Sequence, residues 1–285
     1  MRKECGMHRE FKTRKVFYHT IMCCVSFLML YPLLWMVFSS FKEENDILLT
    51  AKTLIPRKAT LVHYIEGWKG VGKYSFGAYF RNSFFQEILR VIGMTVSCTI
   101  VAYGFARIRF RLRGFWFALM IGSMCLPEMV LRIPQYLFFN NLGWVGTYLP
   151  IIVPSFFGNA YFIFMVMQFM KGIPRELDES AKIDGCGWFG LFARIMLPLV
   201  QPAVAMVAIM TFIDAWNDFY GALIYLNKPS LYPVAYALKF FSDMYTTDYG
   251  SLLAMSTLSL VPVILLFSIF QKSLIEGIAT TGIKG

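Results

Sequence analysis

Six long apolar stretches set the strongest limit on how this chain folds. They cover residues 17–39, 84–106, 114–132, 148–170, 199–224 and 250–271. A helix needs about 20 predominantly apolar residues to cross the hydrocarbon core of a bilayer. Backbone N–H and C=O groups find no water there, so a spanning segment must pair them within itself as a helix. The sequence therefore predicts an all-α membrane protein with six transmembrane helices.

The overall composition agrees with a chain that lies in a lipid bilayer. Of the 285 residues, 57% are hydrophobic and only 15% are charged, whereas about 25% are charged in a soluble protein. The net charge of +10 could point to nucleic acid, but lysine and arginine also collect in the cytoplasmic loops of membrane proteins. We therefore expect a lipid bilayer around the chain and no nucleic-acid partner.

The distribution of lysine and arginine predicts which side of the membrane each loop occupies. Basic residues gather before residue 17, in the loop 107–113 and in the polar passage 171–198, and basic loops are typically cytoplasmic. The apolar run 17–39 is long enough to span, so we expect a retained helix and not a cleaved signal peptide. The expected organisation is a cytoplasmic segment (1–16), a first transmembrane helix (17–39), an extracellular loop (40–83), a five-helix core (84–271, coupling loop 171–198) and a cytoplasmic tail (272–285).

No motif in the chain predicts a catalytic, nucleotide or metal site. His8, His19 and His63 are scattered without the spacing of metal ligands. Gly67 to Lys73 matches the G-x-x-x-x-G-K part of a phosphate-binding loop, but Tyr74 stands where serine or threonine would bind magnesium. We therefore expect no metal, no cofactor and no enzymatic activity in this chain.

The passage ELDESAKIDGCGWFGLFARIMLP, residues 176–198, is unusually polar for its surroundings. Pro174 suits the start of a helix, and acidic residues follow at the end where the helix dipole favours them. Gly185 and Gly187 provide a place to stop, because glycine accepts the left-handed conformation. These signals predict a helix over residues 175–184.

One face of that helix carries short side chains. Leu177, Ser180, Ala181 and Asp184 follow the i, i+3, i+4, i+7 pattern. A surface of this kind allows another molecule to approach closely. The aromatic residues that follow, from Trp188 to Phe192, fit an ordinary amphipathic helix at the membrane surface. Docking to a partner accounts for both halves of the passage.

The spacing within this passage resembles a family signature. Glu179-Ser180-Ala181 is followed by Gly185 and then by Ile195-Met196-Leu197-Pro198, which is similar to the E-A-A, G, I-x-L-P signature of binding-protein-dependent ABC transporter permeases. YPLLWMVFSSFK (31–42), AYGFARIRF (102–110) and WNDFYGALIYL (216–226) also resemble the carbohydrate-import branch. The chain most resembles the six-span second permease subunit of maltose-type transporters.

The resemblance implies a type I ABC importer permease fold in a bacterial cell membrane, with both termini cytoplasmic. It implies a second permease subunit, an ABC ATPase dimer and an extracellular sugar-binding protein as partners, and a sugar or oligosaccharide as substrate. ATP and magnesium would bind the ATPase. The residues that the resemblance assigns to ATPase coupling are Glu179, Ser180, Ala181, Asp184, Gly185, Ile195, Leu197 and Pro198, and those of a tail contact are Thr280, Gly282 and Gly285.

Polar residues in the fifth apolar stretch are candidates for the substrate path. Asp214 and Asp218 lie one helical turn apart, with Trp216, Asn217 and Tyr220 around them. Aromatic rings stack on sugars, and carboxylates accept hydrogen bonds from hydroxyl groups. The alternative is hydrogen bonding between helices. The segment 225–249 is the candidate contact for the binding protein, and the alternative there is a solvated loop.

Two other functions compete with the permease. A self-sufficient secondary transporter would need its own coupling-ion site and commonly an internal repeat. Neither is visible in the sequence. A membrane enzyme would need a group of reactive side chains at one depth, which the chain also lacks. We therefore predict a transport subunit that depends on an ATPase.

Overall fold

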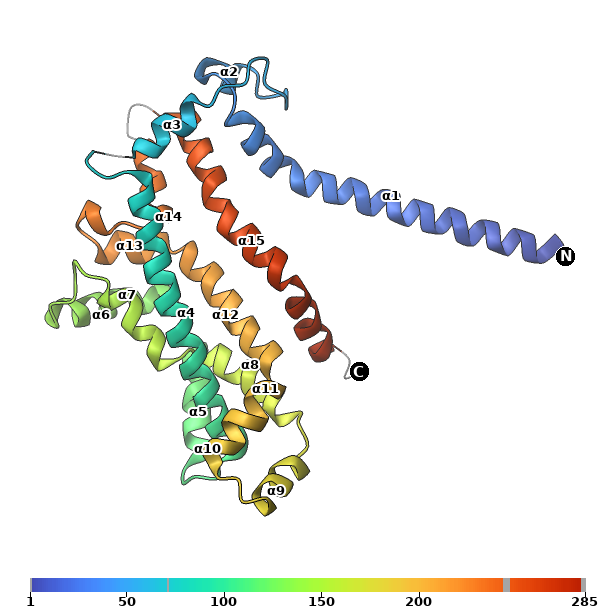
Figure 1. The fold of residues 1–285 in the computed structure, drawn as a ribbon, viewed down its shortest axis with the longest axis vertical. Coiled ribbons are helices and arrows are strands. Elements are labelled where there is room, and N and C mark those ends of the chain that lie inside the picture. Colours follow the sequence, from blue (N-terminus) through green and yellow to red (C-terminus); the bar gives the residue numbers. More distant parts are fainter. Residues whose placement is uncertain (1, 71, 243–246, 283–285) are drawn as a thin grey trace. The chain divides into compact units, whose positions relative to one another are not determined.

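The computed structural model describes residues 2–70, 72–242 and 247–282, with side chains described for 15–70, 72–242 and 247–271. Every regular element within these ranges is a helix, so the all-α prediction is confirmed. Figure 1 shows the helices, coloured from the N-terminus to the C-terminus. The chain divides into two compact units. Unit 1 contains Met1–Lys69 and Phe241–Leu258, and unit 2 contains Gly70–Phe240 and Ser259–Gly285.

Unit 1 is built from three N-terminal helices and the first turns of the last helix. These are α1 (Arg2–Ser39), α2 (Glu44–Leu49), α3 (Val62–Lys69) and the start of α15 (Tyr249–Gly282). The loop after α1 is closed by Lys42, whose ammonium donates hydrogen bonds to the carbonyl oxygens of Thr50 at 3.0 Å and Thr53 at 2.7 Å. The aromatic rings of Phe41 and Tyr64, 5.2 Å apart, bring α3 against this loop.

Unit 2 contains the remaining helices. They are α4 (Phe76–Arg107), α5 (Arg113–Met124), α6 (Glu128–Asn141), α7 (Leu149–Ile152), η1 (Val153–Phe157), α8 (Ala160–Lys171), α9 (Glu176–Ile183), α10 (Trp188–Gly190), η2 (Leu191–Met196), α11 (Leu197–Leu199), α12 (Gln201–Trp216), α13 (Phe219–Tyr225), η3 (Pro229–Leu231), α14 (Val234–Ala237) and η4 (Leu238–Phe241), and the later turns of α15 follow.

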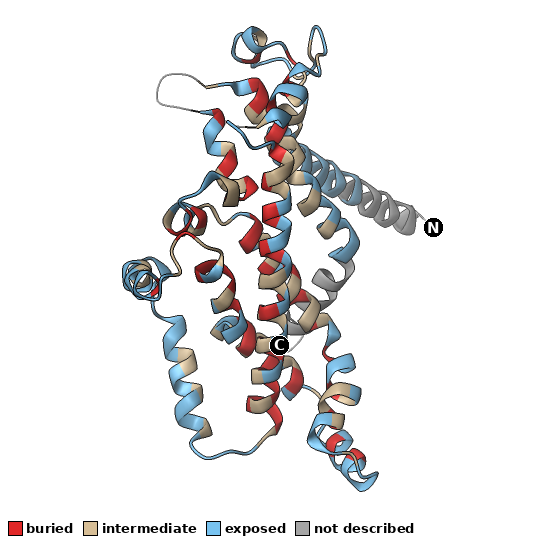
Figure 2. Ribbon diagram, turned by 60° about the vertical axis from the view of Figure 1, so that its left-hand side comes forward, coloured by how far each residue is buried: buried red, intermediate tan, exposed pale blue. Residues whose placement is uncertain are grey.

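Helices α4, α8 and α12 form the core of unit 2. Small residues lie where they meet, including Cys98 and Ala102 of α4 and Ala203 of α12, all fully buried. Small side chains let membrane helices approach closely enough for backbone and side-chain packing to hold them. Val166 of α8 fills the space between them. Figure 2 shows buried positions along α4, whereas α5 has no buried residue and is mostly exposed.

Four helices are long and apolar enough to cross a membrane, and two bent helix pairs bring the number to as many as six among the described residues. The four are Lys15–Ser39, Phe76–Arg107, Leu149–Lys171 and Tyr249–Gln271. The bent pairs are Arg113–Met124 with Glu128–Asn141 and Trp188–Leu199 with Gln201–Trp216. The predicted six-helix membrane fold therefore holds, although two spans are broken.

The third predicted span, 114–132, was wrong as a continuous helix. α5 ends at Met124, and α6 sets off at 103° to it and continues to Asn141. Pro127 lies at the break with an extended backbone, since proline has no N–H to donate and disfavours helical geometry in the residue before it. The loop expected after residue 132 is therefore mostly helix.

The fifth predicted span, 199–224, also ends early. α12 stops at Trp216, and α13 begins at Phe219 after a break. The π-helical turn η2 and a 75° bend precede α12. The bend lies between Pro198 and Pro202, each of which removes one backbone donor from the helical ladder. Asp214 and Asp218 consequently lie on different elements, although the sequence predicted a single helix for both.

Candidate functional site

The short polar helix α9 forms as the sequence predicted, within one residue at each end. It runs from Glu176 to Ile183 with acidic residues in its first turn. Gly185 takes the left-handed conformation with φ 78°. The N–H of Cys186 donates to the carbonyl of Ala181 at 2.9 Å, and that of Gly185 to Lys182 at 3.0 Å. These two bonds make a Schellman motif, which satisfies the last carbonyls of the helix.

The two sides of α9 differ in burial. Asp178 and Ala181 are buried, and Ala181 belongs to the core cluster of unit 2. The predicted small-residue face is therefore divided, because Ala181 packs inside this chain while Ser180 and Asp184 are exposed. Glu179 is also exposed, and the side chain of Ile183 is 86% exposed. A partner reaching α9 would meet Glu179, Ser180 and Ile183 on its outward side.

Arg107 at the end of α4 holds α9 in place. Its Nη2 donates to the carbonyl oxygens of Met170 and Ile173, both at 2.8 Å. Its Nε lies 3.4 Å from Oδ2 of Asp178. This contact is an ion pair without a hydrogen bond, because Nε makes none among the described residues. The Arg107 side chain is only 2% exposed, so one buried cation joins α4, the end of α8 and α9.

In the segment after α9, some residues pack against the core and others are exposed. Leu191 and Met196 are buried, whereas Trp188 and Phe189 are at least half exposed. The Lys182 ammonium lies over the ring of Trp188 at 4.4 Å. The other predicted coupling residues divide in the same way: Ile195 packs on the core, while Leu197 and Pro198 are exposed.

Asp218 lies in a break between two helices. Its Oδ1 accepts from the N–H of Gly221 at 2.8 Å, which makes it the N-cap of α13. Its Oδ2 accepts from Arg90 of α4 at 3.1 Å. The charge of Arg90 is thus paired within the chain, and Glu87 one turn earlier is buried.

The other candidates for a substrate path differ in accessibility. Trp216 is buried, and its indole N–H donates to the carbonyl of Ser259 at 3.0 Å. Asn217 is exposed and donates to its own helix at Ile213. Asp214 and Tyr220 are exposed. Trp216 therefore takes part in hydrogen bonding between helices, which was the alternative raised from the sequence. Asp214 and Tyr220, in contrast, remain accessible to a ligand.

A cation lies over the Tyr220 ring. The Arg132 guanidinium carbon is 4.8 Å from the ring centroid. The guanidinium of Arg132 in α6 thus contacts an aromatic ring of another helix, α13. Tyr220 therefore combines an exposed ring with a neighbouring positive charge.

The segment 225–249 is ordered where it is described. Asn82 of α4 donates to the carbonyls of Ser230 at 2.8 Å and Tyr232 at 3.1 Å. The Tyr232 ring meets Tyr236 edge-on at 4.6 Å. The expected alternative of a solvated loop does not describe this part. Residues 243–246 lie outside the described residues.

The predicted tail contact is only partly described. Thr280 and Gly282 belong to α15, but their side-chain surroundings are not described, and Gly285 lies outside the described residues. The tail contact stays a prediction.

Three site residues were missed from the sequence. Arg107 was counted only as a charge of a loop, Asp178 only as an acidic residue at the start of the predicted helix, and Ile183 was not singled out. An isoleucine on the side of α9 opposite Ala181 was a signal for an outward apolar contact. Nothing in the local sequence pairs Arg107 with Asp178, because that pairing depends on how α4 and α9 meet.

The sequence matches a protein family over most of the predicted core. Residues 94–279 match the family described as the inner membrane component of binding-protein-dependent transport systems. The match covers α9, the Gly185 turn and the segment that leads to Pro198.

Relatives and a solved structure agree with this match. The chain is 34% identical to "Probable ABC transporter permease protein YurM" of Bacillus subtilis, over 90% of this chain and 84% of that protein. It is 31% identical to "Arabinooligosaccharides transport system permease protein AraQ" of Halalkalibacterium halodurans, over 92% of this chain and 93% of that protein. Its fold matches a chain of a bacterial ABC transporter that imports the polysaccharide alginate, with a TM-score of 0.80 and 19% identity over 92% of this chain and 96% of that one. The chain is thus a transport subunit and belongs to the family of inner membrane components of binding-protein-dependent transport systems.

Proposed function

We propose that this chain is a permease subunit of an ATP-driven (ABC) sugar importer in a bacterial cell membrane. It works with a second permease, an ABC ATPase dimer and an extracellular sugar-binding protein. ATP and magnesium bind the ATPase, and both termini of this chain are cytoplasmic. The family supports the binding protein as a partner. The name of the arabinooligosaccharide relative supports a sugar or oligosaccharide as substrate.

The observation that carries this proposal is the division of α9 into an anchored side and an exposed side. Asp178 and Ala181 fix the helix to the permease, while Glu179, Ser180 and Ile183 face outward. A helix that is attached on one side passes the movement of a partner to the helices that hold it. Arg107 connects that movement to α4 and α8.

Ile183 is the residue through which the docking is best tested. Ile183 is 86% exposed, whereas Leu177, the other large apolar residue of α9, is 43% exposed. Fully burying a side chain of this size contributes about 1.5–3 kcal/mol. Docking on the ATPase therefore depends on Ile183, while the fold of this chain does not.

The test compares two lysine substitutions at exposed isoleucines. Ile183→Lys keeps a residue suited to the end of a helix, because cations are favourable there. Ile55→Lys is the matched control, at a loop position that is 73% exposed. Tagged chains are cross-linked in their own membranes and isolated, and co-isolated proteins are identified by mass. We expect Ile183→Lys to lose the ABC ATPase about 10-fold or more and to keep the second permease, while Ile55→Lys keeps both.

Two results would contradict the proposal. One is an equal yield of ATPase from Ile183→Lys and Ile55→Lys. The other is uptake of arabino-oligosaccharides into liposomes that hold this chain alone without ATP, which would indicate a secondary transporter.

A further inference from the structure

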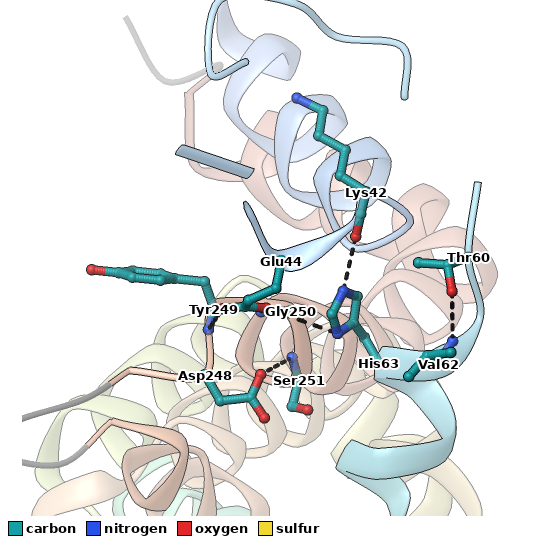
Figure 3. Close-up of polar contacts among 9 residues, drawn as sticks. All are labelled: Lys42, Glu44, Thr60, Val62, His63, Asp248, Tyr249, Gly250 and Ser251. Carbon is teal, nitrogen blue, oxygen red and sulfur yellow. Dashed lines mark hydrogen bonds and ion pairs between the residues drawn. The ribbon is translucent and has the colours of Figure 1, made fainter. Parts of the chain in front are cut away.

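Three side chains of unit 1 that are far apart in the sequence converge on one point. Glu44 begins α2, His63 lies in α3, and Asp248 immediately precedes α15. One potential ligand atom from each lies within 4.8 Å of the others. Figure 3 shows the imidazole and the two carboxylates turned toward one another. The sequence predicted no metal site, because the spacing of the histidines gives no sign of this convergence.

The hydrogen bond of His63 determines which nitrogen faces the carboxylates. Its Nε2 lies 2.8 Å from the carbonyl oxygen of Lys42. A carbonyl oxygen only accepts, so Nε2 carries a proton and donates it. In the neutral ring the lone pair is then on Nδ1. A backbone partner of this kind is how proteins usually orient a metal-binding histidine.

The Nδ1 atom has no hydrogen-bond partner among the described residues. It lies 3.9 Å from Oε2 of Glu44, which is beyond hydrogen-bonding distance. His63 as a residue is only 8% exposed. A lone pair that faces two carboxylates brings three electron-rich groups together, and a positive charge between them stabilises that arrangement. Either a metal ion or a proton on Nδ1 would supply that charge.

Gly250 allows the imidazole to occupy this position. A β-carbon at residue 250 would lie 2.1 Å from Nδ1 and 2.2 Å from Cε1 of His63. Those distances place it on the face of the ring, where any side chain would collide. Lys42 therefore fixes one edge of the ring and the Gly250 backbone supports one face, so Nδ1 keeps its direction.

Both carboxylates are also held by backbone groups. Glu44 accepts from the N–H groups of Tyr249 at 3.0 Å and Gly250 at 2.9 Å. Asp248 accepts from the N–H of Ser251 at 2.9 Å. A carboxylate has about four lone-pair sites, so each can also bind a cation. The two negative charges outweigh the helix dipole, which places only about +0.5 of a charge at the start of α15.

We propose that Glu44, His63 and Asp248 bind one divalent transition-metal ion of the zinc type. One imidazole nitrogen and two carboxylate oxygens suit Zn²⁺ and Co²⁺, whereas Mg²⁺ and Ca²⁺ prefer oxygen alone. The ion joins the segments after α1, in α3 and before α15, all within unit 1. It stabilises the ordered structure of that unit and takes no part in ATP hydrolysis.

The experiment uses the full chain, purified in detergent and treated with a chelator. Zn²⁺ binding is measured by calorimetry and metal content, and Co²⁺ provides the visible absorption of a bound ion. We expect one ion per chain that raises the Tm. Asp248→Asn keeps a side chain suited to the N-cap but loses a charged ligand, and His63→Gln removes the nitrogen. Each variant should lower the affinity by more than about 10–100-fold, the effect of losing even an outer partner of a metal ligand.

Two controls separate this site from other metal-binding groups. His19→Gln changes an exposed histidine of α1 and should leave the affinity unchanged. Glu66→Gln changes an exposed carboxylate of α3 that pairs with Lys69 and should also have no effect.

Two outcomes would overturn the proposal. The first is Zn²⁺ binding that is absent, or equal in the original chain, His63→Gln and Asp248→Asn. The second is a Tm that does not respond to Zn²⁺ in the original chain.

Discussion

Two arginines of α4 each pair with an aspartate, but in different surroundings. Arg107 and Asp178 are 3.4 Å apart, with side chains 2% and 11% exposed. Arg90 and Asp218 are 3.1 Å apart, with side chains 18% and 26% exposed. The first pair joins α9 to the core of the permease, whereas the second lies beside the candidate substrate residues Asp214 and Tyr220 on α12 and α13.

The difference lies in what each arginine holds besides its aspartate. Arg107 also donates to two backbone carbonyls at the end of α8, so losing it would remove both of these hydrogen bonds and leave the Asp178 carboxylate without its ion-pair partner. Arg90 binds Asp218, whose other oxygen caps α13 and would keep that bond. The buried pair fixes α9, the helix that we propose docks on the ATPase. The more exposed pair leaves its charges partly accessible beside the candidate substrate residues.

The largest expected effect is that of Arg107→Ala. Removing one partner of a buried ion pair destabilises a protein by about 3–5 kcal/mol, because the other charge is left uncompensated. We expect a lower Tm in detergent and rapid proteolysis between residues 171 and 187, where α9 would detach. Thermal unfolding and the mapped cleavage sites measure this.

Arg109→Ala is the matched control, since Arg109 is exposed two residues away. Its Tm and cleavage pattern should equal those of the original chain. If Arg107→Ala behaved like Arg109→Ala, Arg107 would not be the anchor of α9.

A smaller effect is expected for Asp218→Asn. Asparagine caps helices about as well as aspartate, so α13 should remain formed while the ion pair with Arg90 is lost. Partly exposed ion pairs contribute about 0.2–1 kcal/mol, and the Tm should fall only slightly. Sugar uptake by the assembled transporter should fall more than the Tm suggests if this charge lies on the substrate path.

Glu43→Gln controls for the loss of a charge alone, because Glu43 is exposed and makes no ion pair or side-chain capping bond among the described residues. A Tm loss for Asp218→Asn as large as that for Arg107→Ala would remove the distinction between the two pairs.

The sequence predicted the helices more accurately than it predicted the contacts between residues. Pro174 and Gly185 predicted the ends of α9 because proline and glycine act on the backbone of their own residues. The break at Pro127 was missed because the apolar run continues through it. An apolar run indicates that a segment lies in apolar surroundings, but it does not indicate the direction of the helix axis.

Burial of individual residues was harder to predict. Ala181 was expected to face a partner, but it packs on this chain, since an eight-residue helix of small side chains has no strong apolar face to orient it. Arg107 with Asp178, and His63 with Glu44 and Asp248, depend on how distant segments meet. Local periodicity carries no information on such pairs.

The smallest expected effect concerns Lys42 in unit 1. Like Arg107, Lys42 donates hydrogen bonds to two backbone carbonyls. Unlike Arg107, it makes no ion pair among the described residues. Burial lowers the pKa of Lys42 from its usual 10.5, and nearby Asp46 partly opposes that lowering of the pKa. Between the lowered pKa and 10.5 the unfolded chain binds more protons than the folded one, so the free energy of unfolding rises with pH in that window.

The prediction for Lys42 is a difference in pH dependence. As the pH rises toward the usual lysine pKa of about 10.4, the Tm of the original chain should rise relative to that of Lys42→Met, by the equivalent of about 1 kcal/mol or less. The exposed Lys52 lies in the same loop, and Lys52→Met should follow the original chain. Parallel curves for Lys42→Met and the original chain would mean that the ammonium of Lys42 is solvated. Its two carbonyl contacts would then not resemble the buried anchor that Arg107 makes.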